Sequence, residues 1–126
     1  MKYRFKIILI SVILYSSCKP QKILYLTLPD NHPQKLFLYT DYSEYKPLKT
    51  DKKGNFYLTV DTSKIATSTH YKKIFYAKLY YSINNSEFKS IRELPYPYDI
   101  YRVGAGYVDT NNIEIINCIE YYFRIK

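Results

Sequence analysis

The sequence predicts an all-β protein, an antiparallel two-sheet sandwich that follows an N-terminal signal segment. Seven to nine short apolar or alternating segments follow one another, separated by turn residues, and no helical period stands out beyond the first residues. The composition agrees, because 17 Tyr and many Ile suit pleated, half-buried surfaces. A chain of 126 residues with 47% hydrophobic content can bury one core, which argues against disorder. Two Cys exclude a disulfide framework.

Residues 1–17 have the three-part pattern of an export signal. Basic Lys2, Arg4 and Lys6 precede a predominantly apolar stretch of nine residues, 7–15, and small serines follow. A membrane-spanning helix needs about 20 apolar residues, so this stretch is too short to be an ordinary transmembrane anchor.

The run Ser16-Ser17-Cys18 resembles the end of a bacterial lipoprotein signal, although Tyr15 replaces the usual aliphatic residue. The resemblance implies that the Cys18 thiol is acylated and that the chain is cut just before it. Residues 18–22 then form the lipidated N-terminus and tether. This places the protein in the cell envelope, and Lys19, which is not acidic, indicates the outer membrane. The alternative is an ordinary secretory signal with a coincidental cysteine.

The sandwich is expected over residues 23–126, and its first half contains the clearest local signals. We expect strands at 22–28 and 35–40, joined by a Pro-bounded turn, and a short strand near Leu48. The segment Thr50-Asp51-Lys52-Lys53-Gly54-Asn55-Phe56 predicts a tight hairpin in which Gly54 takes the left-handed conformation. Phe56, Leu58 and Val60 alternate with polar neighbours, so the outgoing strand buries one face.

The stretch T-D-K-K-G-N-F-Y-L-T-V resembles the hairpin of transthyretin-like, carboxypeptidase-regulatory-type domains. The resemblance covers residues 36–60. It implies a β-sandwich of the immunoglobulin or transthyretin type and carries no function.

The second half is expected to continue as strands. Residues 61–70 form a loop or one helical turn, and a long strand covers 71–83. A turn at 84–86 leads to a short strand near 88–91, after which the prolines of 94–98 prevent central pairing. The predicted turn Gly104-Ala105-Gly106 joins a hairpin of strands 100–103 and 107–108.

A final strand, 113–125, is expected to be central to the fold. Asn117 interrupts its apolar face. Either a bulge there turns Ile116 and Cys118 inward, or Asn117 is buried with hydrogen-bond partners. We favour the bulge, and we expect Cys118 to be an unreactive core residue.

The sequence contains no motif that identifies a catalytic residue. His32 and His70 lie in turn or loop segments, and a base with Ser63 or Ser68 would need contacts that spacing alone does not provide. The hairpin at Gly54 has lysines where calcium ligands would have to be, and no Cys/His cluster suits zinc. We therefore expect no enzymatic activity, metal or cofactor.

Partner contact is expected instead. Without the leader the net charge is +5, which favours weak attraction to acidic surfaces. The basic and aromatic stretch 71–78 is best read as one strand, and an exported protein rarely meets nucleic acid, so no nucleic-acid partner is expected. Tyr96 and Tyr98, stiffened by prolines, are the candidate contacts for a protein or glycan. The alternative is a loop that packs its own tyrosines over a sheet end.

These observations favour a small envelope lipoprotein, a non-enzymatic binding or assembly module that lipid on Cys18 tethers to the membrane. The alternative function is an inhibitor or immunity protein that caps an enzyme or toxin at the envelope.

The first prediction concerns lipidation. Cells grown with labelled palmitate should label the wild-type protein and leave Cys18→Ser unlabelled, because only the thiol accepts the diacylglyceryl group. Label that survives this substitution would contradict the assignment.

Overall fold

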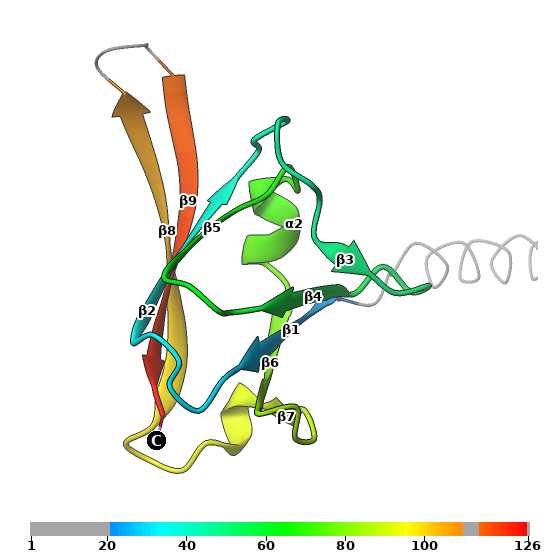
Figure 1. The fold of residues 1–126 in the computed structure, drawn as a ribbon, viewed down its shortest axis with the longest axis vertical. Helices are drawn as coiled ribbons and strands as arrows, with labels where there is room; N and C mark the ends of the chain where they lie inside the picture. Colours follow the sequence, from blue (N-terminus) through cyan, green and yellow to red (C-terminus); the bar gives the residue numbers. More distant parts are fainter. Residues whose placement is uncertain (1–20, 110–113, 126) are drawn as a thin grey trace, which may run out of the picture.

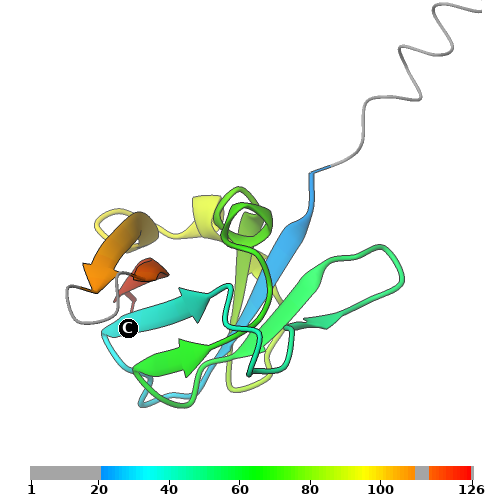
Figure 2. The same ribbon diagram turned by 90° about the horizontal axis from the view of Figure 1, so that it is seen from above.

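In a computed structural model, which describes residues 21–109 and 114–125, the chain forms two sheets packed face to face (Figures 1 and 2). The strands are β1 (Ile23–Leu28), β2 (Lys35–Thr40), β3 (Lys49–Thr50), β4 (Phe56–Thr59), β5 (Lys64–Ala66), β6 (Lys78–Ile83), β7 (Lys89–Ser90), β8 (Asp99–Asp109) and β9 (Glu114–Arg124). Helix α2 (Tyr71–Phe75) lies between the sheets, and a 3₁₀ helix, η1 (Ile91–Glu93), follows β7. Within these residues the sheet orders are β3-β4-β1-β6-β7 and β5-β2-β9-β8.

The predicted two-sheet sandwich is confirmed, but its pairing is mixed rather than antiparallel. In the described part of the chain, β1 is parallel to both β4 and β6, and β2 is parallel to β5. The prediction failed because the chain crosses between the sheets after β1, β2, β4, β5 and β7. The parallel neighbours are therefore joined by long crossovers through the other sheet, which permit parallel pairing, whereas β3–β4, β6–β7 and β8–β9 remain antiparallel.

Alternating side chains build the core between the sheets. Leu24, Leu26 and Leu28 of β1 are fully buried, while the residues between them are only half-buried. β2 repeats the pattern, and β9 adds Tyr121 to the same cluster. Burying a side chain such as leucine is worth about 1.5–3 kcal/mol, so these three strands supply much of the stability.

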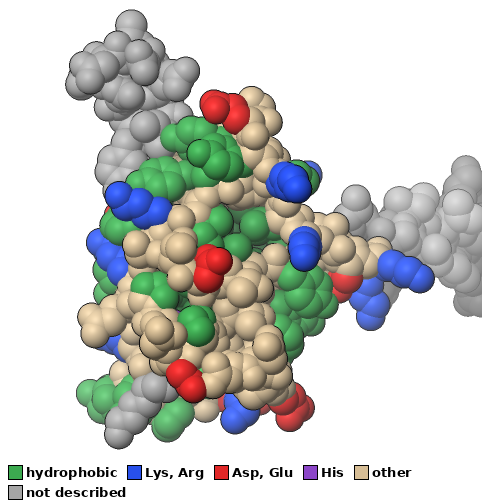
Figure 3. Space-filling view, in the orientation of Figure 1, with side chains coloured by type: hydrophobic (Ala, Val, Ile, Leu, Met, Phe, Trp, Pro, Cys, Tyr) green, Lys and Arg blue, Asp and Glu red, His purple; other side chains and the backbone are tan. Residues whose placement is uncertain are grey.

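The turn chemistry is largely as predicted. Gly54 has φ +81°, and the Oδ1 of Asp51 accepts hydrogen bonds from the amides of Lys53 and Asn55 at 2.9 Å each. Asn84 and Asn85 also have positive φ, which confirms the turn before β7. Several Lys and Arg side chains lie around the β3–β4 hairpin (Figure 3).

The predicted long strand over 71–83 is wrong in its first half. Residues Tyr71–Phe75 form α2, and only Lys78–Ile83 is a strand. His70 provides no side-chain cap, but the Oδ2 of Asp41 accepts a hydrogen bond from the Tyr71 amide at 3.1 Å. The helix also buries Ile74 completely. A distant cap and this burial favour the helix over the extended form.

The predicted loop over 61–70 contains the short strand β5, because Lys64–Ala66 pairs with β2.

The predicted turn at Gly104-Ala105-Gly106 is also wrong, because β8 runs through it and pairs with β9 from Asp99 to Asp109. A Cβ atom on Gly104 would lie 1.7 Å from the hydroxyl of Tyr71 and 2.9 Å from its ring. Glycine here makes room for a side chain of α2 rather than for a turn. Residues 110–113, which include the expected start of the final strand, lie outside the described residues.

The favoured bulge in the last strand is absent. Asn117 pairs in continuous register with Thr40 and Gly106, and it is half-buried. Its amide donates to Asp41 at 3.2 Å, so the alternative of a hydrogen-bonded asparagine holds. Cys118 is fully buried as expected, opposite Tyr39, whereas the side chain of Ile116 lies outside the described set.

Candidate functional site

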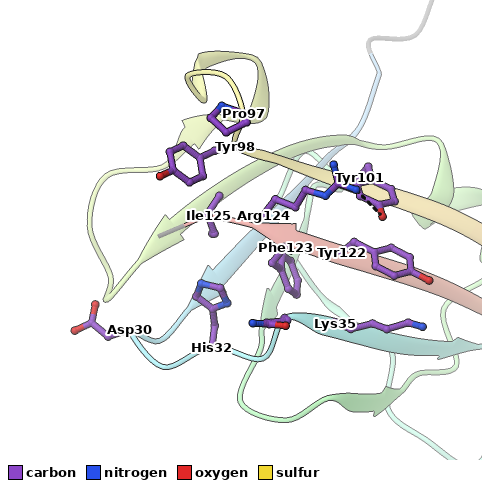
Figure 4. Close-up of a pocket in the computed structure, with 11 residues that line it drawn as sticks. Asp30, His32, Lys35, Pro97, Tyr98, Tyr101, Tyr122, Phe123, Arg124 and Ile125 are labelled. Carbon is purple, nitrogen blue, oxygen red and sulfur yellow. Dashed lines mark hydrogen bonds between the residues drawn. The ribbon is translucent and has the colours of Figure 1, made fainter.

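A cleft of about 900 Å³ opens at the end of the sandwich where the β1–β2 turn, the segment before β8 and the end of β9 meet (Figure 4). Its walls mix aromatic rings with charged and polar groups. The lining residues are Asp30, His32, Gln34, Lys35, Pro97, Tyr98, Tyr101, Tyr122, Phe123, Arg124 and Ile125.

One wall is a row on the outer face of β2, β9 and β8, in which two stacked rings lie between two cations. Tyr101 and Tyr122 are cross-strand partners, and their rings stack with centroids 4.7 Å apart and planes 8° apart. Arg124 lies 4.9 Å from the Tyr101 centroid and Lys35 lies 4.8 Å from the Tyr122 centroid. Because each exposed ring face meets a cation, the row is held together by cation–π attraction as well as stacking.

Hydrogen bonds and ion pairs order the same wall. The Arg124 Nη2 donates to the Tyr101 hydroxyl at 3.4 Å, and the Arg124 Nε lies 3.8 Å from Asp99. The Tyr122 hydroxyl donates to Glu120 at 2.8 Å, and Glu120 lies 4.0 Å from Lys35. A hydrogen bond that the Lys35 ammonium donates to the Tyr122 oxygen is the largest influence on this group and raises its pKa. The wall therefore presents ordered polar groups, while its ring faces are already covered.

The other side of the cleft carries the predicted contact Tyr98. Figure 4 shows Pro97 and Tyr98 on one side of the β9 end, and Asp30 and His32 on the other. The His32 ring meets Phe123 edge to face at 5.8 Å, and its Nδ1 lies 2.9 Å from the carbonyl of Pro33.

The structure separates the two predicted contact tyrosines. Tyr98 is half-buried in the cleft, whereas Tyr96 is 97% exposed and does not line it. The peptide bond between Tyr96 and Pro97 is cis. Cys18, the predicted lipidation site, lies outside the described residues.

Sequence reasoning missed the row formed by Lys35, Tyr101, Tyr122 and Arg124. Alternation could show only that each residue faces outward from its own strand. The pairing of β8 with β9 and of β2 with β9 brings them together, and that register depends on contacts distant in the sequence.

A second cluster surrounds the carboxylate of Asp41, beyond the end of β2. One oxygen lies 2.6 Å from His70 Nδ1, and the other accepts hydrogen bonds from Thr40, the Tyr71 amide and Asn117. Partial burial raises the pKa of Asp41, but the bonds from His70, Tyr71, Asn117 and Thr40 outweigh it and leave the pKa below its usual value. The cluster thus joins β2, α2 and β9.

This pairing of His70 with a carboxylate resembles the base and acid of a catalytic triad. A triad would also need a serine nucleophile, for which Ser63 and Ser68 were the candidates. Ser68 lines the same hollow as His70, but within the described residues no hydrogen bond joins a serine hydroxyl to the His70 ring. A nucleophile must contact its base, and capping α2 is sufficient to account for Asp41. Ser63 contributes a carbonyl that accepts from Phe37.

The described residues, 21–109 and 114–125, offer neither a metal site nor a reactive thiol. No group of three or more His, Cys, Asp or Glu is placed there to hold a metal, and no helix there is long and apolar enough to cross a membrane. Burial, followed by the charge of Glu120, raises the pKa of the Cys118 thiol to about 11, which leaves little reactive thiolate at neutral pH.

A second prediction tests the Asp41 cluster. Asp41→Asn should lower the free energy of unfolding at pH 7 by about 1–3 kcal/mol, because charge-assisted bonds to His70 and the α2 amide weaken. The lowered pKa means that the carboxylate stabilises the fold above its unfolded pKa, near 3.9, and that this contribution is lost as pH falls through the folded value. Denaturant titrations should therefore show the difference between wild type and variant shrinking below about pH 4.

The matched control is Asp61→Asn, on an exposed residue of the β4–β5 loop, which should change little at any pH. A difference between wild type and Asp41→Asn that stays constant from pH 7 to pH 3 would contradict the role given to the charge.

Comparisons with known proteins bear on the fold. No protein-family model and no curated protein matches the chain. The structure is similar to the crystal structure of a Bacillus anthracis protein provisionally described as a lipoprotein. The TM-score is 0.56 at 12% sequence identity, over 82% of this chain and 71% of the other. At that identity the likeness shows a shared fold.

Proposed function

We propose that this chain is a small envelope lipoprotein, held to the membrane by lipid on Cys18, that acts as a non-enzymatic binding or assembly module. The basic start, short apolar stretch and Ser16-Ser17-Cys18 support the anchor. The similarity of the fold to a protein provisionally described as a lipoprotein is consistent with it. Lys19 favours the outer membrane. Lipid attachment holds such a domain stably when more than one acyl chain is present.

The observation that carries the binding role is the position of the cleft relative to the tether. The described chain begins at Gln21, just before β1, and β1 leads directly to Asp30 in the cleft wall. A strand rises about 3.3 Å per residue, so the six residues of β1 separate the two by roughly 20 Å. A domain held at Gln21 would therefore present the cleft away from the membrane, where a partner can reach it.

The chemistry of the cleft suits a protein or glycan partner. Tyr98 offers a rigid amphipathic ring, and Asp30, Gln34 and Arg124 offer hydrogen-bonding groups around it. An inhibitor or immunity protein would use the same cleft, and the identity of the partner distinguishes that function from assembly.

A third prediction tests the cleft. A photo-crosslinking amino acid at position 98 of the full chain in its native cells should capture a partner, because Tyr98 lines the proposed contact. The matched control is position 57, since Tyr57 is a 38% exposed tyrosine on the other sheet. A glycan partner would appear as a crosslinked species that glycosidases shorten. Equal products from both positions, or none from position 98, would contradict the proposal.

A further inference from the structure

We propose that the end of the domain around Gln21 rests on an anionic phospholipid surface through a basic collar, defined as Lys22, Lys53, Lys73, Lys78 and Arg92. The inference rests on the proposed lipid anchor at Cys18. It adds a second membrane contact, made by the folded domain itself.

The length of the tether places this end at the membrane. Only Lys19 and Pro20 separate Cys18 from Gln21. Consecutive Cα atoms are about 3.8 Å apart, so Gln21 lies within roughly 11 Å of the acylated residue. A domain of this size cannot turn its far end toward the membrane on so short a link without moving its near end out of reach.

The first described residues, Gln21 and Lys22, are already hydrogen-bonded to the folded domain. The Gln21 side chain donates to the carbonyl of Tyr76 at 2.6 Å, and the Lys22 ammonium donates to the carbonyl of Lys53. The carbonyl of Lys22 accepts from the amide of Lys78 at 2.9 Å. The tether thus meets the end of α2, the β3–β4 hairpin and β6 together, so the orientation of the domain follows that of the anchor.

Two hollows flank this point, and both are lined by cations without carboxylates. One, of about 270 Å³, is lined in part by Gln21, Lys78, Arg92 and Arg102. The other, of about 680 Å³, is lined in part by Lys22, His70 and Lys73. No Asp or Glu lines either hollow, whereas Asp30 lines the cleft at the far end.

The cations of the collar are not neutralised by carboxylates. All five are exposed, and within the described residues none of them takes part in an ion pair. Lys35 and Arg124 in the cleft, by contrast, pair with Glu120 and Asp99. The carboxylate in the adjoining hairpin, Asp51, is occupied by the amides of Lys53 and Asn55.

An exposed tyrosine completes the surface. Tyr76, whose carbonyl holds Gln21, is 64% exposed beside the tether. Tyrosine favours the headgroup level of a bilayer, where its ring is partly buried and its hydroxyl stays wet. Exposed cations attract anionic headgroups within a Debye length, and the anchor keeps them inside that distance. The contact therefore needs little intrinsic affinity to set the orientation.

The test is amine footprinting of the lipidated protein on vesicles. Purified protein is reconstituted on phosphatidylcholine alone or with added phosphatidylglycerol, treated with an amine-reactive ester and mapped by mass spectrometry. On the anionic vesicles the rate of reaction should fall by a factor of about three or more at Lys22, Lys53, Lys73 and Lys78. High salt should restore the rate. Lys35 and Lys64, on the second sheet, serve as internal controls and should react equally on both vesicles.

Variants make the comparison specific. The variant Lys53→Gln, Lys73→Gln, Lys78→Gln should lose the protection of Lys22, whereas the control variant Lys64→Gln, Lys89→Gln, at exposed lysines outside the collar and the cleft, should keep it. Equal reaction of the collar lysines on both vesicles would overturn the inference, as would equal protection of Lys35 and Lys64. Protection of the collar by inorganic phosphate on phosphatidylcholine vesicles would also overturn it, in favour of a soluble anion. If the protein sediments with neither vesicle, both the proposed lipid anchor and the collar are contradicted. If it sediments but its collar lysines are not protected, only the collar is contradicted.

Discussion

The central position of β1 is the constraint on which the rest of the structure depends. β1 pairs in parallel with β4 on one side and β6 on the other, and its three leucines are fully buried. A strand that is hydrogen-bonded on both edges and apolar on its inner face has a single register. Only that register pairs both edges and also buries the apolar face. That register fixes Gln21 at one end of the sandwich and Asp30 at the other.

The Asp41 carboxylate imposes a second constraint by joining the sheets to the helix between them. It lies just after β2, caps α2 through the Tyr71 amide and accepts a bond from Asn117 of β9. α2 in turn presses Tyr71 against the glycine of β8 and carries Tyr76 to the tether. The domain consequently has two unlike ends: a cationic one where the chain enters, and a cleft with mixed charge and aromatic walls at the other. For a lipid-anchored protein this polarity assigns one end to the membrane and the other to a partner.

Local signals in the sequence were enough to predict the strands and turns whose causes are local. Alternation gave the strand Lys35–Thr40 with its observed bounds, and the Gly54 hairpin follows from residues within a few positions of one another. The incorrect predictions have distant causes. The cap of α2 comes from Asp41, thirty positions before Tyr71. Gly104 lies in a strand because it pairs with Ile119, and it is a glycine because Tyr71 occupies the space beside it. Of the candidate site, Tyr98 was named from its own segment. The stacked row beside it depends on strand register and could not be derived from spacing.

The central claim is this polarity, and energy transfer to the membrane tests it most directly. Lys53→Cys and Tyr98→Cys, each labelled with a donor fluorophore in the lipidated protein, would be compared on vesicles containing acceptor lipids. The native thiol Cys118 is fully buried with a pKa raised to about 11, so labelling should be confined to the introduced site. The account predicts more efficient transfer from position 53, at the tether end, than from position 98, in the cleft. Equal efficiencies, or greater transfer from position 98, would contradict it.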